Sequence, residues 1–103
     1  MTRQLLPNRR EARTFGLNWY GTDFTVSIGL FADGMPAECF VTGAKSGVEV
    51  QSLSRDGAIL LSLALQYGAP LDVIAHSITR NPDGSPQSFI GALVESIKAE
   101  MQR

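Results

Sequence analysis

The chain has 103 residues, 44% of them hydrophobic and 18% charged, and a net charge of −1. This length fits one domain, and the composition argues against a disordered chain. The near-neutral charge disfavours a strongly basic nucleic-acid module. One cysteine and one histidine exclude an intrachain disulfide and a zinc site with four Cys/His ligands.

The first 13 residues are polar and basic, and we predict a basic N-terminal arm over 1–13 that precedes a single domain over 14–103. The arm could dock on phosphate or on an acidic partner, and the alternative is a solvated tail. A polar, Arg-rich start is not typical of a signal peptide, and the longest apolar stretch is too short to span a bilayer. With the single cysteine, these features predict a cytoplasmic protein.

The segment after the arm predicts three strands, because apolar and polar residues alternate along it. This period of two is typical of strands with one buried and one solvent-facing side. The pattern places Phe31 on the solvent side. Gly21 and the pair Asp33-Gly34 mark tight turns between the strands, which favours an antiparallel meander. The alternating runs are 15–20, 24–31 and 37–42.

A long helix is predicted next. Ser46 and Glu49 have the spacing of a capping box, and the helix that they begin runs to about Tyr67. Residues 57–65 are apolar almost all round, so we expect this helix to be buried. Arg55 interrupts the apolar pattern and needs a partner or solvent.

Two further helices complete the chain. Gly68 ends the long helix, and Pro70 opens a short one. A turn follows, and Ser85 and Pro86 are predicted to cap and to begin the last helix, which has an apolar stripe over 89–101. The expected fold class is therefore α+β, with a three-stranded antiparallel β-meander followed by a long buried helix and two further helices.

Few residues have the types and spacing of a reactive site. His76 has no nucleophile beside it in the sequence, and we interpret it as a surface or satisfied histidine. Cys39 lies in phase with Ala37 and Val41 and is interpreted as a small buried apolar residue. We predict no catalytic residue, no metal ligands and no cofactor. The loop before the long helix could bind an anion at the helix N-terminus, although it lacks the spacing of a phosphate-binding loop.

Short motifs occur along the chain in a characteristic order. They are Leu6-Pro7-Asn8-Arg9-Arg10, Gly29, Asp33-Gly34, Glu38, Phe40, Gly43, Lys45, Gly47, Leu65-Gln66-Tyr67-Gly68 and Pro70-Leu71. Their order and spacing resemble the TSCPD domain, a family found at the C-terminal end of adenosylcobalamin-dependent ribonucleotide reductases and as short stand-alone proteins. The resemblance covers residues 6 to about 95.

One departure from the family pattern limits what the resemblance implies. The family is named for a Thr-Ser-Cys-Pro-Asp run, and the equivalent stretch here runs from Thr79 to Asp83, with Asn81 in the place of the cysteine. Any thiol or metal role tied to that cysteine is therefore in doubt. Ribonucleotide reduction needs a radical generator and paired thiols. A chain with one cysteine does not supply these thiols, so we expect no reduction by this chain alone.

The resemblance implies a non-catalytic accessory domain linked to deoxyribonucleotide synthesis, with a ribonucleotide reductase, a nucleotide or a nucleic acid as its partner. The alternative is a small nucleic-acid-binding module with a β-sheet plus helix surface, against which the acidic body counts. A stand-alone enzyme using His76 or Cys39 is the third hypothesis. A homo-oligomer is compatible with all three. The predicted binding residues are Arg9, Arg10, Arg13, Lys45, Ser46 and Gly47.

Overall fold

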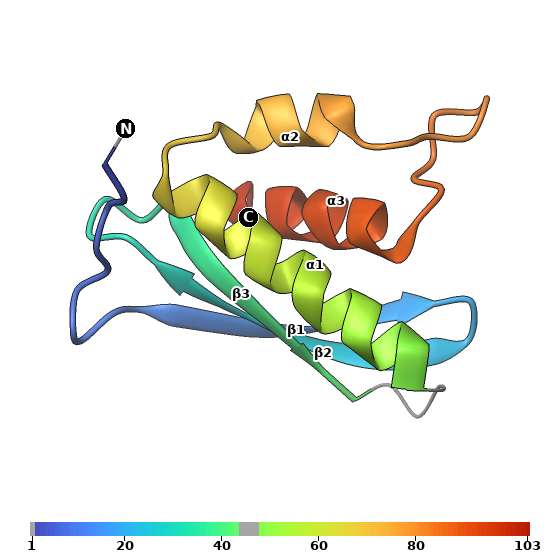
Figure 1. The fold of residues 1–103 in the computed structure, drawn as a ribbon, viewed down its shortest axis with the longest axis horizontal. Helices are drawn as coiled ribbons and strands as arrows, with labels where there is room; N and C mark the ends of the chain where they lie inside the picture. The colour runs from blue at the N-terminus through green and yellow to red at the C-terminus, as the bar shows by residue number, and fades with distance from the viewer. Residues whose placement is uncertain (1, 44–47) are drawn as a thin grey trace.

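The computed structural model describes residues 2–43 and 48–103 and places three strands before three helices (Figure 1). This order confirms the predicted α+β fold class. None of the helices in these described ranges has the length and hydropathy needed to cross a membrane. The elements are β1 (Ala12–Trp19), β2 (Thr22–Leu30), β3 (Pro36–Thr42), α1 (Val48–Gln66), α2 (Leu71–Ser77) and α3 (Phe89–Met101).

The three strands form an antiparallel sheet in the order β1-β2-β3, as the alternation predicts. Phe15 lies opposite Val26, and Ile28 lies opposite Cys39, so the apolar residues of all three strands share one face. The turn between β1 and β2 consists of Tyr20 and Gly21, whose φ angles are 49° and 82°. Two positive φ values in a two-residue loop are typical of the type I′ turn, which matches the twist of paired strands.

The predicted place of Phe31 on the solvent face is wrong. Phe31 is 8% exposed and follows a register shift between Gly29 and Leu30 in the pairing of β2 with β3. A β-bulge adds a residue to one strand and interrupts the alternation of sides. As a result, Leu30 and Phe31 are both buried although they are consecutive.

All three helices lie on the same side of the sheet: α1 packs on β3, α3 packs on β1, and α2 packs on α3 (Figure 1). The residues that are fully buried between the two layers come mainly from the middle of β2 and from α3. The outer face of the sheet is mostly polar apart from the exposed Phe40, and there the hydroxyl groups of Thr14 and Ser27 lie 3.1 Å apart. The largest fully buried side chains are Val26, Ile28, Leu30, Leu93, Val94 and Ile97.

The long helix α1 has 19 residues, but the prediction that it is buried holds on one side only. Ala58, Leu61 and Leu65 face the core, whereas Leu53 and Leu60 are 63% and 68% exposed. A three-stranded sheet offers one side of the helix a partner, and α3 contacts α1 over a short stretch near Gly57. Val50 and Ile59 of α1 are also exposed, whereas Leu63 and Ala64 are half-buried.

The predicted start of the last helix is wrong by one turn. Ser88, rather than Ser85, is the N-cap of α3, and its hydroxyl group accepts a hydrogen bond from the Gly91 amide at 3.1 Å. Ser85 instead donates to the Asp83 carboxylate, and Pro86 forms a β-bridge with Arg80. These contacts hold the sequence before α3 in a loop. The predicted capping box of α1 depends on Ser46, which lies outside the described residues.

Candidate functional site

The arginines of the predicted basic arm do not form one surface. Arg10 donates to the Glu38 carboxylate at 2.6 Å on the outer side of the sheet. Arg13 donates to the carbonyl oxygen of Glu100 at 3.0 Å, in the last turn of α3. Arg9 is exposed and makes no hydrogen bond or ion pair within the described residues. The other predicted site residues, Lys45, Ser46 and Gly47, lie outside the described ranges.

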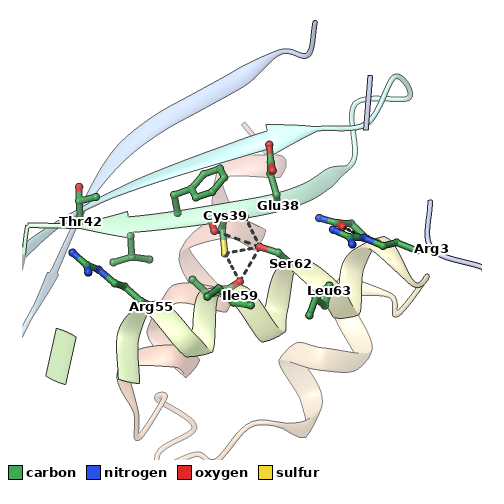
Figure 2. Close-up of a pocket in the computed structure, with 12 residues that line it drawn as sticks. Arg3, Glu38, Cys39, Thr42, Arg55, Ile59, Ser62 and Leu63 are labelled. Atoms are coloured by element: carbon green, nitrogen blue, oxygen red, sulfur yellow. Dashed lines mark hydrogen bonds between the residues drawn. The ribbon is translucent and has the colours of Figure 1, made fainter. Parts of the chain in front are cut away.

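A groove of about 560 Å³ lies along the free edge of β3, where α1 lies beside the strand (Figure 2). We call it the β3–α1 groove. Its walls are mostly apolar, and two arginines lie at its opposite ends. The groove is lined by Arg3, Glu38, Cys39, Phe40, Val41, Thr42, Arg55, Ala58, Ile59, Ser62, Leu63 and Gln66.

Two side chains of α1 bond to the free edge of β3. The Cys39 amide donates to Ser62 Oγ at 2.9 Å, and Gln66 Nε2 donates to the Ala37 carbonyl oxygen at 3.0 Å. Ser62 and Gln66 are four residues apart in α1, and their partners Cys39 and Ala37 are two residues apart in β3. The two distances nearly match, because four residues of a helix rise about 6 Å and two residues of a strand rise about 6.8 Å. This part of the edge is therefore closed to a further strand.

The edge is open at Val41. Along an antiparallel strand, the backbone amide and carbonyl groups of one residue point toward a given neighbouring strand, and those of the next residue point away from it. Since the Cys39 amide bonds to α1, the amide and carbonyl groups of Val41, two residues on, also point away from β2. Continuing the pairing of Gln66 with Ala37 and Ser62 with Cys39 by four more helix residues leads to Ala58 opposite Val41. Ala58 has no polar side chain, and no other group in the described chain bonds to the outward amide and carbonyl groups of Val41. A donor and an acceptor are thus available side by side in the β3–α1 groove.

The two arginines of the groove differ in their surroundings. Arg3 Nε donates to Gln66 Oε1 at 2.6 Å, which ties the N-terminal segment to the last turn of α1. Arg55 extends from α1 near Thr42 at the other end of the groove (Figure 2). It is exposed and forms no ion pair or hydrogen bond with any described residue. Arg55 is therefore the groove's available cation, and it lies at the same end as the open edge of Val41.

The thiol of Cys39 lies at the bottom of the β3–α1 groove, but it is not arranged for nucleophilic chemistry. The residue is 3% exposed, as predicted, and Sγ donates to the Ala58 carbonyl oxygen at 3.6 Å. Burial raises the pKa of this thiol to about 11, more than the hydrogen bond from Ser62 lowers it. The reactive thiolate is therefore scarce at neutral pH.

Other reactive arrangements are not found in the described chain. No group of three or more His, Cys, Asp or Glu side chains there is placed to hold a metal ion. His76 is exposed on α2, as one of the two predicted interpretations had it. Asn81 lies in the turn that the sequence predicts, and its side chain donates to Ser85 Oγ at 3.0 Å. Its environment is that of a turn residue.

The sequence interpretation missed the residues that make the groove. The prediction of a basic arm over 1–13 includes Arg3 without assigning it a contact, and Arg55 is predicted only to need a partner or solvent. Ser62 and Gln66 had a signal, because they are polar residues four apart in an otherwise apolar stretch of α1. Such spacing places two polar groups on one side of a helix.

A family model and several relatives of known name match this chain. The family described as "TSCPD domain" matches residues 3–101. A vitamin B12-dependent ribonucleotide reductase of Rhodopirellula baltica is 35% identical over 77 residues, which are 75% of this chain and 7% of that protein. The enzyme of the same name from Bradyrhizobium diazoefficiens is 35% identical over 86 residues, 82% of this chain and 7% of the reductase. The chain thus spans a small part of these relatives. No solved structure matches it.

Proposed function

This chain belongs to the TSCPD domain family, and on that basis we propose that it is a non-catalytic accessory domain of deoxyribonucleotide synthesis that binds a nucleotide in its β3–α1 groove. The reductase relatives support the link to deoxyribonucleotide synthesis, because the chain matches a short region of each. The groove carries the binding part of the proposal.

The chemistry of the β3–α1 groove fits the parts of a nucleotide. A volume of about 560 Å³ lies within the usual range of small-ligand sites, which is roughly 300–1,000 Å³. Its apolar walls suit the faces of a base, and the adjacent amide and carbonyl groups of Val41 suit the donor–acceptor edge of a base. The free guanidinium group of Arg55, at the same end, suits a phosphate, for which arginine offers a fork of donors.

A binding role without catalysis is supported by the state of the single thiol. Cys39 is buried, hydrogen-bonded to a backbone carbonyl group and raised in pKa to about 11. Ribonucleotide reduction needs paired thiols that deliver electrons and a radical generator. The domain would therefore serve a reductase rather than replace one, in the cytoplasm.

The second contact of the proposal is a ribonucleotide reductase. The predicted residues Arg9, Arg10, Arg13, Lys45, Ser46 and Gly47 stay our proposal for that surface. Arg9 is its most accessible described member, because it is exposed and Arg10 and Arg13 are engaged within the domain. Arg9 does not line the groove, so the two contacts can be tested separately.

The test is a titration of the purified chain with a panel of ribonucleoside and deoxyribonucleoside phosphates, followed by calorimetry and thermal shift. A ligand of the native state raises the melting temperature by mass action. Arg55→Ala should weaken binding about 10- to 100-fold, as expected for a charge-assisted bond worth about 1.5–3 kcal/mol. Arg9→Ala removes the same charge outside the groove and is the matched control. Equal affinities of the two variants, or no binding at millimolar nucleotide, would refute the nucleotide site.

The base contact and the reductase contact have their own tests. Val41→Pro removes the open amide without touching the β2 ladder, since proline is tolerated where the N–H group faces away from the sheet. We expect it to weaken binding of nucleotides but not of inorganic pyrophosphate. In a pull-down with a B12-dependent reductase, Arg9→Ala should lower capture and Arg55→Ala should not. A reductase that captures neither variant nor wild type would remove the partner part of the proposal.

A further inference from the structure

A row of exposed apolar side chains lies along the side of α1 that faces away from β3 and ends at Tyr67, the residue directly after the helix. Leu53 and Leu60 are 63% and 68% exposed, and Val50 and Tyr67 are 42% and 43% exposed. Together these four residues expose roughly 400 Å² of surface, most of it apolar, which is comparable to the 300–600 Å² of the largest apolar patch on a typical monomer, and such patches are often functional.

The row continues through two small residues with the spacing of a helix-packing surface. Its members are separated by three and four residues in alternation, which is the heptad pattern of helices that pack along their length. We call this set the α1 seam. It consists of Val50, Leu53, Gly57, Leu60, Ala64 and Tyr67.

The α1 seam is symmetric about its middle. Val50 and Tyr67, Leu53 and Ala64, and Gly57 and Leu60 form three pairs that are each centred midway between positions 58 and 59. If two copies of α1 lay antiparallel about that point, each pair would meet across the contact. Leu53 would then face the small Ala64, and Leu60 would face Gly57 together with the Ile90 side chain that packs over it. Interfaces of this kind, in which residue i meets j and j meets i, are what a two-fold dimer requires.

We propose that a second copy of this chain packs antiparallel on α1, along the α1 seam. In an antiparallel dimer each side chain of the seam meets a side chain of the same seam in reverse order, so the two must fit each other in size. An unrelated partner would not impose this requirement. Each copy carries both the projecting Leu60 and, near the middle of the seam, the groove that would receive the partner's Leu60, which favours a second copy as the occupant.

The surroundings of the α1 seam fit this partner. A groove of about 430 Å³ runs beside it and is lined by Leu53, Gly57 and Leu60 together with Phe89 and Ile90 of α3. Ile90 packs so closely on Gly57 that a Cβ atom there would collide with it. The partner's Leu60 would therefore enter the groove beside Ile90, because the Ile90 side chain already covers Gly57.

The exposed apolar surface along the α1 seam is large enough for a dimer interface. A standard interface buries about 800 Å² per partner, of which about 60% is apolar. The four exposed side chains of the α1 seam supply most of that apolar share, and the half-buried Phe89 and Ile90 add to it. The β3–α1 groove lies on the other side of α1, where Arg55 and Ile59 line it, so the dimer leaves the proposed nucleotide site accessible.

The first experiment measures the oligomeric state of the purified chain by sedimentation equilibrium across the micromolar range. We expect a dimer, and we expect Leu60→Glu to raise its dissociation constant about a hundredfold or more, as for a central interface residue. Val73→Glu is the matched control, because Val73 is 57% exposed on α2 and lies outside the seam. Both variants change exposed side chains, and their thermal melts check that each still folds.

The second experiment tests the register. Leu53→Cys/Ala64→Cys places thiols opposite each other in the antiparallel dimer and should form interchain disulfides under mild oxidation. Val50→Cys/Leu53→Cys places both thiols at one end of the seam, away from their copies, and should not. The native Cys39 is buried and does not compete.

Three outcomes would overturn the proposal. They are a chain that stays monomeric throughout the micromolar range, a dimer that Leu60→Glu leaves intact, and equal cross-linking of the two cysteine pairs. A monomer whose capture by a B12-dependent reductase is lost in Leu60→Glu would assign the seam to the reductase and would also overturn it.

Discussion

Replacing Ser62 with alanine tests how the edge of the sheet is held. Ser62 Oγ accepts the Cys39 amide at 2.9 Å and donates to the Ala58 carbonyl oxygen at 2.8 Å. The variant leaves the Cys39 amide without its acceptor, and an unsatisfied buried donor costs about 1–3 kcal/mol. Ser62 is half-buried beside an open groove, so water can reach the amide in part, and we expect a loss of about 1–2 kcal/mol.

Ser96→Ala is the control for the same substitution within a helix. Ser96 Oγ donates to the Ala92 carbonyl oxygen at 2.8 Å, four residues earlier, as Ser62 does to Ala58, but it bonds to no strand. The gain in helix propensity from alanine is common to both variants and cancels. Urea unfolding measures the free energies, and a difference of 1 kcal/mol corresponds to roughly 4–8 °C in melting temperature. If Ser62→Ala is no less stable than Ser96→Ala, the strand bond does not stabilise the fold.

Three further predictions follow from other contacts. Gln66→Ala should cost about 1–3 kcal/mol of unfolding free energy, because Gln66 is 4% exposed and bonds to β3 and to Arg3, and hydrogen exchange near Arg3 should speed up with it. Cys39 should react slowly with a thiol reagent near neutral pH in the native state and fast in urea, since burial raises its pKa to about 11, and equal rates would contradict that burial. Hydrogen bonds from the Ser85 hydroxyl and amide groups lower the pKa of Asp83, so its stabilising effect is present at neutral pH and is lost as the pH falls through the folded-state value. Urea unfolding from neutral to acidic pH should therefore show a smaller loss of stability in Asp83→Asn than in wild type, and parallel curves would contradict this.

Local patterns in the sequence predicted most of the fold. Period-two alternation and glycine-containing turns gave the meander, and helical spacing gave the three helices in the right order. The errors arise where a tertiary contact overrides a local preference. Ser85 and Pro86 have the residue types of a helix start, but Asp83 and Arg80 hold them in a loop. Phe31 follows a register shift that no local pattern announces.

The site was harder to predict because closeness in sequence is not closeness in space. Arg10 and Arg13 are three residues apart, yet Arg10 bonds on the outer side of the sheet and Arg13 bonds to the helical layer. Arg3 and Arg55 are distant in the sequence and lie at the two ends of one groove. The prediction that α1 is buried overestimates the number of its faces that are covered. The sequence shows which faces of the helix are apolar, but it does not show how many of them contact another element.

The pairing of α1 with the edge of β3 also has a geometric limit. Each step of four residues along a helix turns about 40° beyond a full revolution and advances about 0.8 Å less than two residues of a strand. Gln66 and Ser62 stay within reach of the strand, but Ala58, one step further, has rotated into the core, where it is 3% exposed. A straight helix therefore seals only a few residues of a neighbouring strand. The period mismatch between helix and strand, rather than a missing side chain alone, determines where the sheet edge opens.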